Sequence, residues 1–335
     1  MTLRAFLNRC KTKPFIVLMM GLCSCGSGFH SLPLSNLGSS VGIMYSIDGA
    51  NHRVLRYTPN DFGTVTLDSF INLPSSMTAT LVTTDATGNV FIGGYTANVN
   101  RSEVLVYASD ATDDDAPART LTLRPGKLTA LAVDRQSMIY AAEKNTTTSV
   151  YIYAATSNKL VRTIQPAAVD VNDLAVDSTG RVYVSGWNGG ASFIREFSST
   201  ASGSATAMRT LWAPHGSSYG GIAVDDTGNI FVMQGETICE LAAGSTGTPE
   251  PIQTVNLPAK FLSYTNETFS NVLRRDGIGD FFVSATMTDA NGASANMVYG
   301  FAANAGGDAT PMIQFMAPYA TATALNGESI PLAVF

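Results

Sequence analysis

The sequence predicts an all-β fold, a six-bladed β-propeller with four-stranded antiparallel blades. One observation is an aromatic residue that recurs at intervals of 43 to 51 residues from Tyr45 to Phe282. Another is a proline that recurs near the end of each repeat. A third is that the segment 332–335 supplies the apolar strand that the first repeat lacks. A period of ~40 to 50 residues with four strands in each repeat is typical of propeller blades.

The repeated motif is clearest at residues 173–185. Residues 174–176 form a short apolar run that suits a strand buried on both faces, and residues 181–185 alternate with β-branched and aromatic side chains. Between them, Asp177 and Gly180 predict a tight turn, because aspartate bonds the backbone ahead of it and glycine accepts a positive φ. The aspartate recurs in nearly every repeat, as a turn requirement predicts.

The aromatic residue of the second predicted strand measures the repeat. It occurs at Tyr45, Phe91, Tyr140, Tyr183, Phe231 and Phe282. Third strands are predicted at segments such as 104–107 and 150–153, and a fourth at 160–164. No helical pattern of useful length interrupts this order, so each repeat predicts one four-stranded blade.

A proline marks the predicted end of each fourth strand. The six positions are Pro74, Pro125, Pro166, Pro214, Pro258 and Pro318. Proline has no N–H to donate to a strand ladder, so we expect the outer strand to stop there.

The first repeat opens directly on a second strand at residues 43–47, so its innermost strand is missing. Residues 332–335 match the Leu-Ala-Val of the other inner strands. We therefore predict that this segment joins blade 1 and closes the ring, which hides the strand edges of an open array. An open solenoid is the alternative, but it requires polar capping repeats.

Residues 1–24 are predicted to be a lipoprotein signal peptide. Basic residues precede the apolar run 15–22, which is too short for a transmembrane helix. Leu22-Cys23-Ser24-Cys25 resembles the bacterial lipobox, in which Cys25 would be lipidated. Modification at Cys23 and a plain secretory signal are the alternatives. Residues 25–42 then form a lipidated tether, and residues 43–335 form the propeller.

The charge balance argues against nucleic acid as a partner. Four of the 20 basic residues and none of the 26 acidic residues lie in residues 1–24, which leaves a formal charge of −10 on the remainder. Nucleic acids and anionic lipids both require a basic surface. We expect membrane contact through acyl chains on Cys25, and therefore a place in the bacterial cell envelope. An aspartate after the lipidated cysteine would resemble the inner-membrane retention signal of enteric bacteria. Gly26 stands at this position instead, so the outer membrane or the cell surface is favoured.

The residues predict no catalytic set, no metal site and no cofactor. Three histidines, His30, His52 and His215, do not provide zinc spacing. Cys239 is the one cysteine after residue 25, and it reads as a core residue. The acidic run 113–115 lacks the glycine and the terminal glutamate of a calcium loop, so we interpret it as a solvated loop.

Ligand contacts are predicted at the mouth, the face that carries the loops from each second strand to the third and from each fourth strand to the next blade. Aromatic side chains with polar neighbours suit a glycan or a peptide. The candidates are Tyr95, Glu143, Trp187, Asn188, His215, Tyr219, Gln234 and Tyr264. Trp187 is favoured, with a packing role between blades as its alternative.

The pattern at 174–184 and 222–232, with Arg-Thr at 119–120, 162–163 and 209–210, resembles NHL-repeat β-propellers, and more closely a bacterial lipoprotein group. The resemblance covers residues 43–335 and implies six blades. Related propellers are binding scaffolds, lactonases with a channel calcium, or lyases that rely on histidines. The leading hypothesis is a lipid-anchored, non-catalytic module that binds a protein, peptide or glycan. The alternative is a metal-dependent lactonase-like hydrolase or lyase, and calcium in the channel belongs to it alone.

Overall fold

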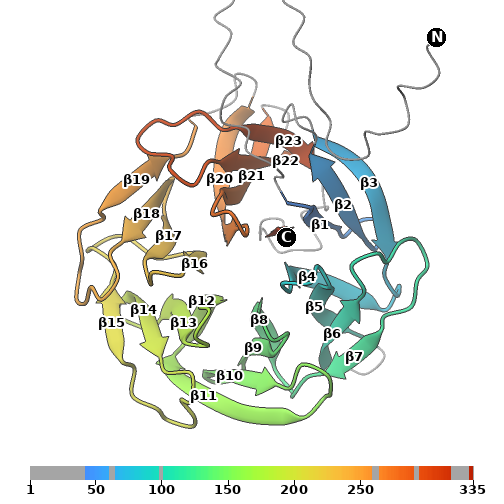
Figure 1. Cartoon of the computed structure of the whole chain (residues 1–335), viewed down its shortest axis with the longest axis horizontal. Coiled ribbons are helices and arrows are strands. Elements are labelled where there is room, and N and C mark those ends of the chain that lie inside the picture. Colours follow the sequence, from blue (N-terminus) through green and yellow to red (C-terminus); the bar gives the residue numbers. More distant parts are fainter. Residues whose placement is uncertain are drawn as a thin grey trace, which may run out of the picture. The chain divides into compact units, whose positions relative to one another are not determined.

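Six antiparallel sheets of four strands each are set around a common centre (Figure 1). The computed structural model describes residues 42–59, 65–97, 101–258, 264–289, 294–317 and 332–334, and within 264–271, 286–289 and 294–296 it describes the backbone alone. The inner strands contact one another in the circular order β24, β4, β8, β12, β16, β20 and back to β24. The prediction of an all-β, six-bladed β-propeller is confirmed.

Within each blade the strands follow one another from the centre of the ring outward. Blade 1 contains β24 (Leu332–Val334), β1 (Met44–Asp48), β2 (Arg53–Pro59) and β3 (Val65–Asn72). Blade 2 contains β4 (Met77–Thr84), β5 (Val90–Thr96), β6 (Arg101–Tyr107) and β7 (Arg119–Thr122). Blade 3 contains β8 (Lys127–Val133), β9 (Ile139–Lys144), β10 (Thr148–Tyr153) and β11 (Leu160–Ala168).

The second half of the ring has the same order. Blade 4 contains β12 (Asp170–Val176), β13 (Val182–Trp187), β14 (Ser192–Phe197) and β15 (Arg209–Trp212). Blade 5 contains β16 (Ile222–Val224), β17 (Ile230–Gln234), β18 (Thr237–Leu241) and β19 (Gln253–Asn256). Blade 6 contains β20 (Tyr264–Arg275), β21 (Phe281–Asp289), β22 (Ser294–Phe301) and β23 (Ile313–Ala317).

Strand β24 closes the ring as predicted. It pairs antiparallel with β1, with Val334 opposite Met44 and Leu332 opposite Ser46. The Thr84 hydroxyl of blade 2 donates to the Val334 carbonyl at 3.1 Å, so the strand also contacts the next blade. Phe335, the last residue of the predicted strand, lies outside the described residues.

Apolar side chains fill the space between neighbouring blades. Among the described residues, six buried clusters occupy the six interfaces between consecutive blades. The six aromatic residues that measure the repeat are all buried in them. Each blade is therefore stabilised by its neighbours, because burial of apolar surface is the main favourable term in folding.

The turn between the first and second strands depends on the recurring aspartate. In blade 4, Asp177 Oδ1 accepts the amides of Thr179 and Arg181 at 2.9 Å each, and Tyr183 donates its hydroxyl to Oδ2 at 3.3 Å. Gly180 has φ +80° in this turn, a conformation that side chains disfavour. These contacts explain why the motif repeats.

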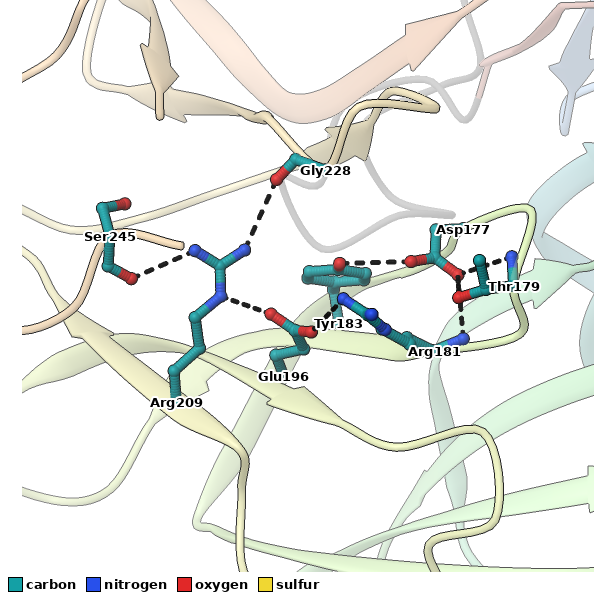
Figure 2. Close-up of polar contacts among 8 residues, drawn as sticks. All are labelled: Asp177, Thr179, Arg181, Tyr183, Glu196, Arg209, Gly228 and Ser245. Carbon is teal, nitrogen blue, oxygen red and sulfur yellow. Dashed lines mark hydrogen bonds and ion pairs between the residues drawn. The ribbon is translucent and has the colours of Figure 1, made fainter. Parts of the chain in front are cut away.

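The Arg-Thr arginines join consecutive blades at their outer edge. Arg119 donates to the carbonyls of Ala154 and Ser157 in blade 3, and Arg162 donates to a carbonyl in blade 4. Arg209 bonds the carboxylate of Glu196 in its own blade and the carbonyls of Ser245 and Gly228 in blade 5 (Figure 2). This part of the NHL-like pattern is therefore structural in this protein.

The acidic run 113–115 belongs to a similar connection. The Asp113 amide donates to the Phe70 carbonyl of blade 1 at 2.6 Å, and Asn72 donates its side-chain amide to Asp114 at 2.7 Å. Asp115 accepts the backbone amide of Thr112. This run is thus a contact between blades 1 and 2.

The prediction that a proline marks the end of each fourth strand is confirmed in four blades and is wrong in one. Pro74, Pro125, Pro214 and Pro258 follow the ends of their outer strands, whereas Pro166 lies within β11. Ladder pairing with β10 breaks between Ile164 and Ala168, and Ala167 there has φ +53°, so the proline needs no N–H for pairing. Pro318 lies outside the described residues.

The predicted signal peptide and tether also lie outside the described residues. In the part of the chain that the structure describes, we find no helix with the length and apolar character needed to cross a bilayer.

Candidate ligand-binding mouth

A groove opens at the mouth between blades 2 and 3, with a volume of about 380 Å³. Its walls come from the middle of β4, from the mouth ends of β5, β6 and β8, and from the loop that joins β7 to β8. The lining residues are Thr80, Gly94, Tyr95, Arg101, Ser102, Pro125, Gly126, Lys127 and Leu128. Small-molecule sites in proteins are usually concave regions of ~300 to 1,000 Å³.

Two glycines of β5 shape the groove. A Cβ at Gly93 would lie 2.6 Å from Leu128 Cδ2, and a Cβ at Gly94 would lie 2.3 Å from the Thr78 carbonyl oxygen. At Gly94 the close atom is backbone, so no side chain fits there and β4 packs directly on the β5 backbone, whereas at Gly93 it is the end of the Leu128 side chain. Ser102 holds the loop above, because its hydroxyl donates to the Gly126 carbonyl and accepts the Leu128 amide.

Side chains that reach solvent stand near the mouth end of successive second strands. Tyr95 is the last residue but one of β5, opposite Thr78 and Ser102. The half-buried Lys144 ends β9, and Trp187 ends β13 opposite Asp170 and Ser192. Tyr95 is 45% exposed and Trp187 is 40% exposed. Two aromatic rings therefore face solvent on blades 2 and 4, with a lysine on the blade between them.

The structure places the other candidates unequally. His215 is exposed in the loop before β16 and Gln234 is half-buried at the end of β17. The Asn188 amide oxygen accepts the backbone amides of Gly190 and Ala191, so it holds its own turn. The side chain of Tyr264, at the start of β20, lies outside the described residues.

Two candidates are buried, and their predicted exposure needs correction. Tyr219 is 1% exposed, because its amide bonds Ser192 Oγ and its ring packs into the cluster between blades 4 and 5. Its hydroxyl donates to the Trp212 carbonyl at 3.1 Å. Glu143 is 2% exposed and points into the interface between blades 2 and 3, beneath Gly126.

Burial raises the pKa of Glu143 to about 7, against its ordinary value of 4.5. A backbone hydrogen bond from Arg124, the Tyr153 hydroxyl and the Arg124 charge oppose this rise. Oε1 lies 3.5 Å from the Tyr153 hydroxyl, while Oε2 has no hydrogen-bond partner among the described residues. The carboxylate form is therefore poorly solvated in the folded protein.

We predict that Glu143 makes the folded protein less stable as the pH rises. Its pKa is higher in the folded state, so stabilisation is complete below pH 4.5 and is lost as the pH passes through about 7. The full loss is about 3 kcal/mol, at ~1.4 kcal/mol for each unit. Glu143→Gln should flatten the pH dependence of the unfolding free energy, measured in urea at pH 5 and pH 8. Equal slopes for the two proteins would contradict the prediction.

A second polar feature joins the inner strands of blades 4, 5 and 6. Arg274 of β20 donates to Asp173 Oδ2 of β12 at 2.8 Å, and the Ile222 amide of blade 5 donates to the same oxygen at 3.2 Å. Burial raises the pKa of Asp173, and the Arg274 charge opposes this. The Leu174 amide donates to Oδ1, so both carboxylate oxygens are hydrogen-bonded. The pair ties blade 4 to blade 6.

Sequence reasoning missed this pair although a signal was present. Asp173 occupies the inner-strand position where Ala130 and Gly221 lie in blades 3 and 5. Arg274 occupies the position of Ala132 and Ala175. Charged residues at positions that are small or apolar in other blades, such as Leu81 in blade 2, were the available signal. Among the described residues, no group of three or more His, Cys, Asp or Glu side chains is placed to hold a metal ion.

Comparison with known proteins finds structural likenesses at low sequence identity and no family. No protein family model matches the chain, and no curated protein matches it. A protein of unknown function from Bacteroides caccae aligns over 88% of this chain and 98% of its own, with a TM-score of 0.56 and 9% identity.

Two propeller domains are less similar. The WD40 β-propeller domain of Doa1 covers 79% of this chain and 94% of its own, with a TM-score of 0.48 and 14% identity. The β-propeller domain of Cps50 (Swd1) from Myceliophteria thermophila covers 73% and 88%, with a TM-score of 0.45 and 10% identity. The six-bladed β-propeller fold is identified by the strand pairing of the protein itself.

Proposed function

We propose that this protein is a lipid-anchored, extracytoplasmic β-propeller of the NHL type that binds a protein, peptide or glycan partner at its mouth without catalysis. The observation that carries the proposal is the groove between blades 2 and 3, with the exposed rings of Tyr95 and Trp187 on the same face. Propellers commonly serve as binding modules. Aromatic rings supply contact area at low entropic cost.

The anchoring part of the proposal depends on Cys25 and its lipobox-like context. Acyl chains on this residue would place the propeller in the bacterial cell envelope, at the outer membrane or the cell surface. Residues 25–42 would be the link between lipid and blades. A single acyl chain binds a membrane only marginally, so a stable anchor requires more than one chain on this residue or a second membrane contact.

We expect Cys25→Ala to release the protein from the membrane. Cells would be grown with an alkyne-labelled fatty acid and fractionated. The wild type should carry the label and sediment with membranes, and Cys25→Ala should lose both properties. Cys23→Ala is the matched control and should keep them. Label and sedimentation retained by Cys25→Ala would remove the anchor from the proposal.

We expect the exposed mouth rings to dominate partner binding. An array of glycans and envelope-protein peptides would be probed with the wild type, Tyr95→Ala and Trp187→Ala. Aromatic hot spots commonly cost 2 kcal/mol or more when truncated, so we expect losses of ~30-fold for the ring that touches the partner. Ile278→Ala is the control, because this exposed apolar residue lies in a turn on the opposite face. Equal effects of mouth and control variants would overturn binding at the mouth.

A further inference from the structure

The outer strand of four blades is capped by a loop of the next blade, and the capping contact repeats. In blade 4, the Trp212 amide donates to the Gly247 carbonyl at 2.6 Å, and the Gly247 amide donates to the Thr210 carbonyl at 3.0 Å. Gly247 lies in the loop that joins β18 to β19 of blade 5, and it pairs in parallel with β15. The equivalent pairs of backbone hydrogen bonds attach Asp113 to β3, Gly203 to β11 and Gly307 to β19.

The four capping residues share one conformation. Each has a positive φ, from +48° at Asp113 to +71° at Gly247, a region that glycine enters most readily. In three of the four loops, the residue that follows is hydrogen-bonded to a side chain of the strand that the loop caps. These pairs are Asp114 with Asn72, Ser204 with Gln165, and Asp308 with Asn256. The protein thus covers an outer strand edge repeatedly in one way.

Blade 2 lacks this cap on its outer strand β7. The loop of blade 3 that would supply it covers residues 154–159, whereas the corresponding loops of blades 2, 4, 5 and 6 are longer and cover residues 108–118, 198–208, 242–252 and 302–312. All residues of the shorter loop are described, and none has a positive φ or makes a backbone hydrogen bond to the β7 backbone. Asn158 donates its side-chain amide to the Thr120 carbonyl at 2.8 Å instead. The loop that would cap β23, residues 60–64, lies outside the described residues.

The backbone of β7 is open at Thr122, which matches Trp212 of blade 4 in its pairing with the third strand. The Leu123 amide donates to the Ser102 carbonyl, so the neighbouring Thr122 amide points away from β6. This amide has no hydrogen-bond partner in the part of the chain that the structure describes, and Thr122 is exposed. The Thr122 hydroxyl is used within the blade, where it donates to Glu103 at 2.8 Å. A strand edge with free backbone groups is a template for pairing with another chain.

A polypeptide is the class of partner that fits this edge. It presents alternating amide donors and carbonyl acceptors at the spacing of a strand, and extended peptides commonly add to sheet edges in this way. The four internal caps show the local sequence that suits the edge, a residue that accepts a positive φ followed by a small polar residue. Figure 1 shows β7 at the rim of the ring, where an extended segment can approach from outside.

We infer that the outer edge of β7 binds an extended segment of a partner protein, with a glycine of that segment opposite Leu121. The segment runs parallel to β7. The glycine carbonyl accepts the Thr122 amide, and the glycine amide donates to the Thr120 carbonyl in place of Asn158. This surface lies on an outer strand and not on the mouth loops, so the inference goes beyond the proposed function and does not depend on it.

The test uses the full chain, labelled with nitrogen-15 in a mild detergent, and a synthetic peptide of residues 242–252, the segment that caps β15. We expect the amide resonances of Thr120 and Thr122 to shift on titration, with a dissociation constant in the millimolar range because few groups pair. The same peptide with Gly247→Val is the matched ligand control. It should bind about 10-fold more weakly, since a side chain disfavours the left-handed conformation.

Two protein variants change the edge in opposite directions. Asn158→Ala frees the Thr120 carbonyl and should tighten peptide binding about 3-fold, the effect of one ordinary hydrogen bond. Replacing residues 154–161 by residues 198–208 gives blade 3 the loop of blade 4, which should cap β7 from within the chain and abolish binding. The same replacement with Gly203→Val is the matched control and should leave the edge open. None of the replaced residues is buried, so melting temperatures close to that of the wild type will show that the variants fold.

The outcomes separate the possible occupants. Shifts at β7 that grow with Asn158→Ala and vanish with the longer loop support the inference. Equal affinity of the two peptides, undiminished binding by the longer-loop variant, or no shift at β7 overturns it. Wild-type dimers that the longer loop abolishes would overturn a partner protein and assign the edge to a second copy of this chain. Tyr95→Ala and Trp187→Ala should leave peptide binding unchanged, and a loss in either would move the peptide to the mouth and overturn the inference.

Discussion

Replacing Leu332-Ala333-Val334 by Gly-Ser-Gly is expected to cost about 4 kcal/mol or more of unfolding free energy, and thus a large part of the ~5 to 15 kcal/mol typical of a folded domain. Leu332 is fully buried, and burial of a leucine side chain contributes ~1.5 to 3 kcal/mol. The ladder pairing of β24 with β1 and the Thr84 hydrogen bond are lost as well. Strand β1 then becomes an unpaired edge that promotes aggregation.

The measurement is urea unfolding with tryptophan fluorescence, together with size-exclusion chromatography for aggregates. Leu332→Val keeps the strand and removes one methylene, so its loss should be about 1 kcal/mol. If the Gly-Ser-Gly variant unfolds at the same urea concentration as the wild type, the closure of the ring does not depend on β24.

Arg209→Ala is expected to destabilise the protein by about 3 kcal/mol, because it leaves a buried carboxylate without its main partner. Glu196 is 3% exposed and bonds Arg209 Nε. Arg209 also donates to the Ser245 carbonyl at 3.0 Å and to the Gly228 carbonyl at 3.4 Å, so it joins blade 4 to blade 5 (Figure 2). One substitution therefore removes a charge partner and a connection between blades.

Arg181→Ala is the matched control for the same carboxylate. Arg181 reaches Glu196 at 3.1 Å from the solvent side and is 44% exposed, so its loss should cost ~0 to 1 kcal/mol. The double variant Arg209→Met with Glu196→Met should recover much of the stability, because apolar residues of similar volume often replace a buried ion pair well. Equal destabilisation by Arg209→Ala and Arg181→Ala would show that burial does not decide the difference.

Most of the fold could be predicted from local sequence patterns. The spaced aromatic residues and the aspartate turns depend on neighbours within a few residues. The structure confirms the buried aromatic residue in every blade and the Asp-to-Gly turn in blades 2, 4, 5 and 6, whereas Ser137 takes the place of the glycine in blade 3. The prediction that the outer strand ends at Pro166 was wrong because of contacts far away in the sequence. Its strand breaks register with β10, and Arg195 of the next blade donates to the Pro166 and Ala167 carbonyls.

The candidate site was only partly predictable. Tyr95 and Trp187 were identified because an aromatic residue at a strand end tends to reach the mouth. Tyr219 looked equivalent on the chain, yet Ser192 of the neighbouring strand binds its amide and turns its ring into the core. Sequence distance does not reveal which loop residue meets which neighbour.

The sequence by itself determined the number of blades, the order of the strands and the closure by β24. The number and order of the strands follow from a repeated local pattern. The closure follows because the first repeat lacks its inner strand and the last segment of the chain has the pattern of one. Only the tertiary structure decided which polar groups meet. Arg274 and Asp173, 101 residues apart, form a hydrogen bond between the inner strands of blades 6 and 4, and the groove is lined by Tyr95 of blade 2 and Lys127 of blade 3. The physical reason is that ring closure and packing between blades set these distances, and no local preference of the chain encodes them.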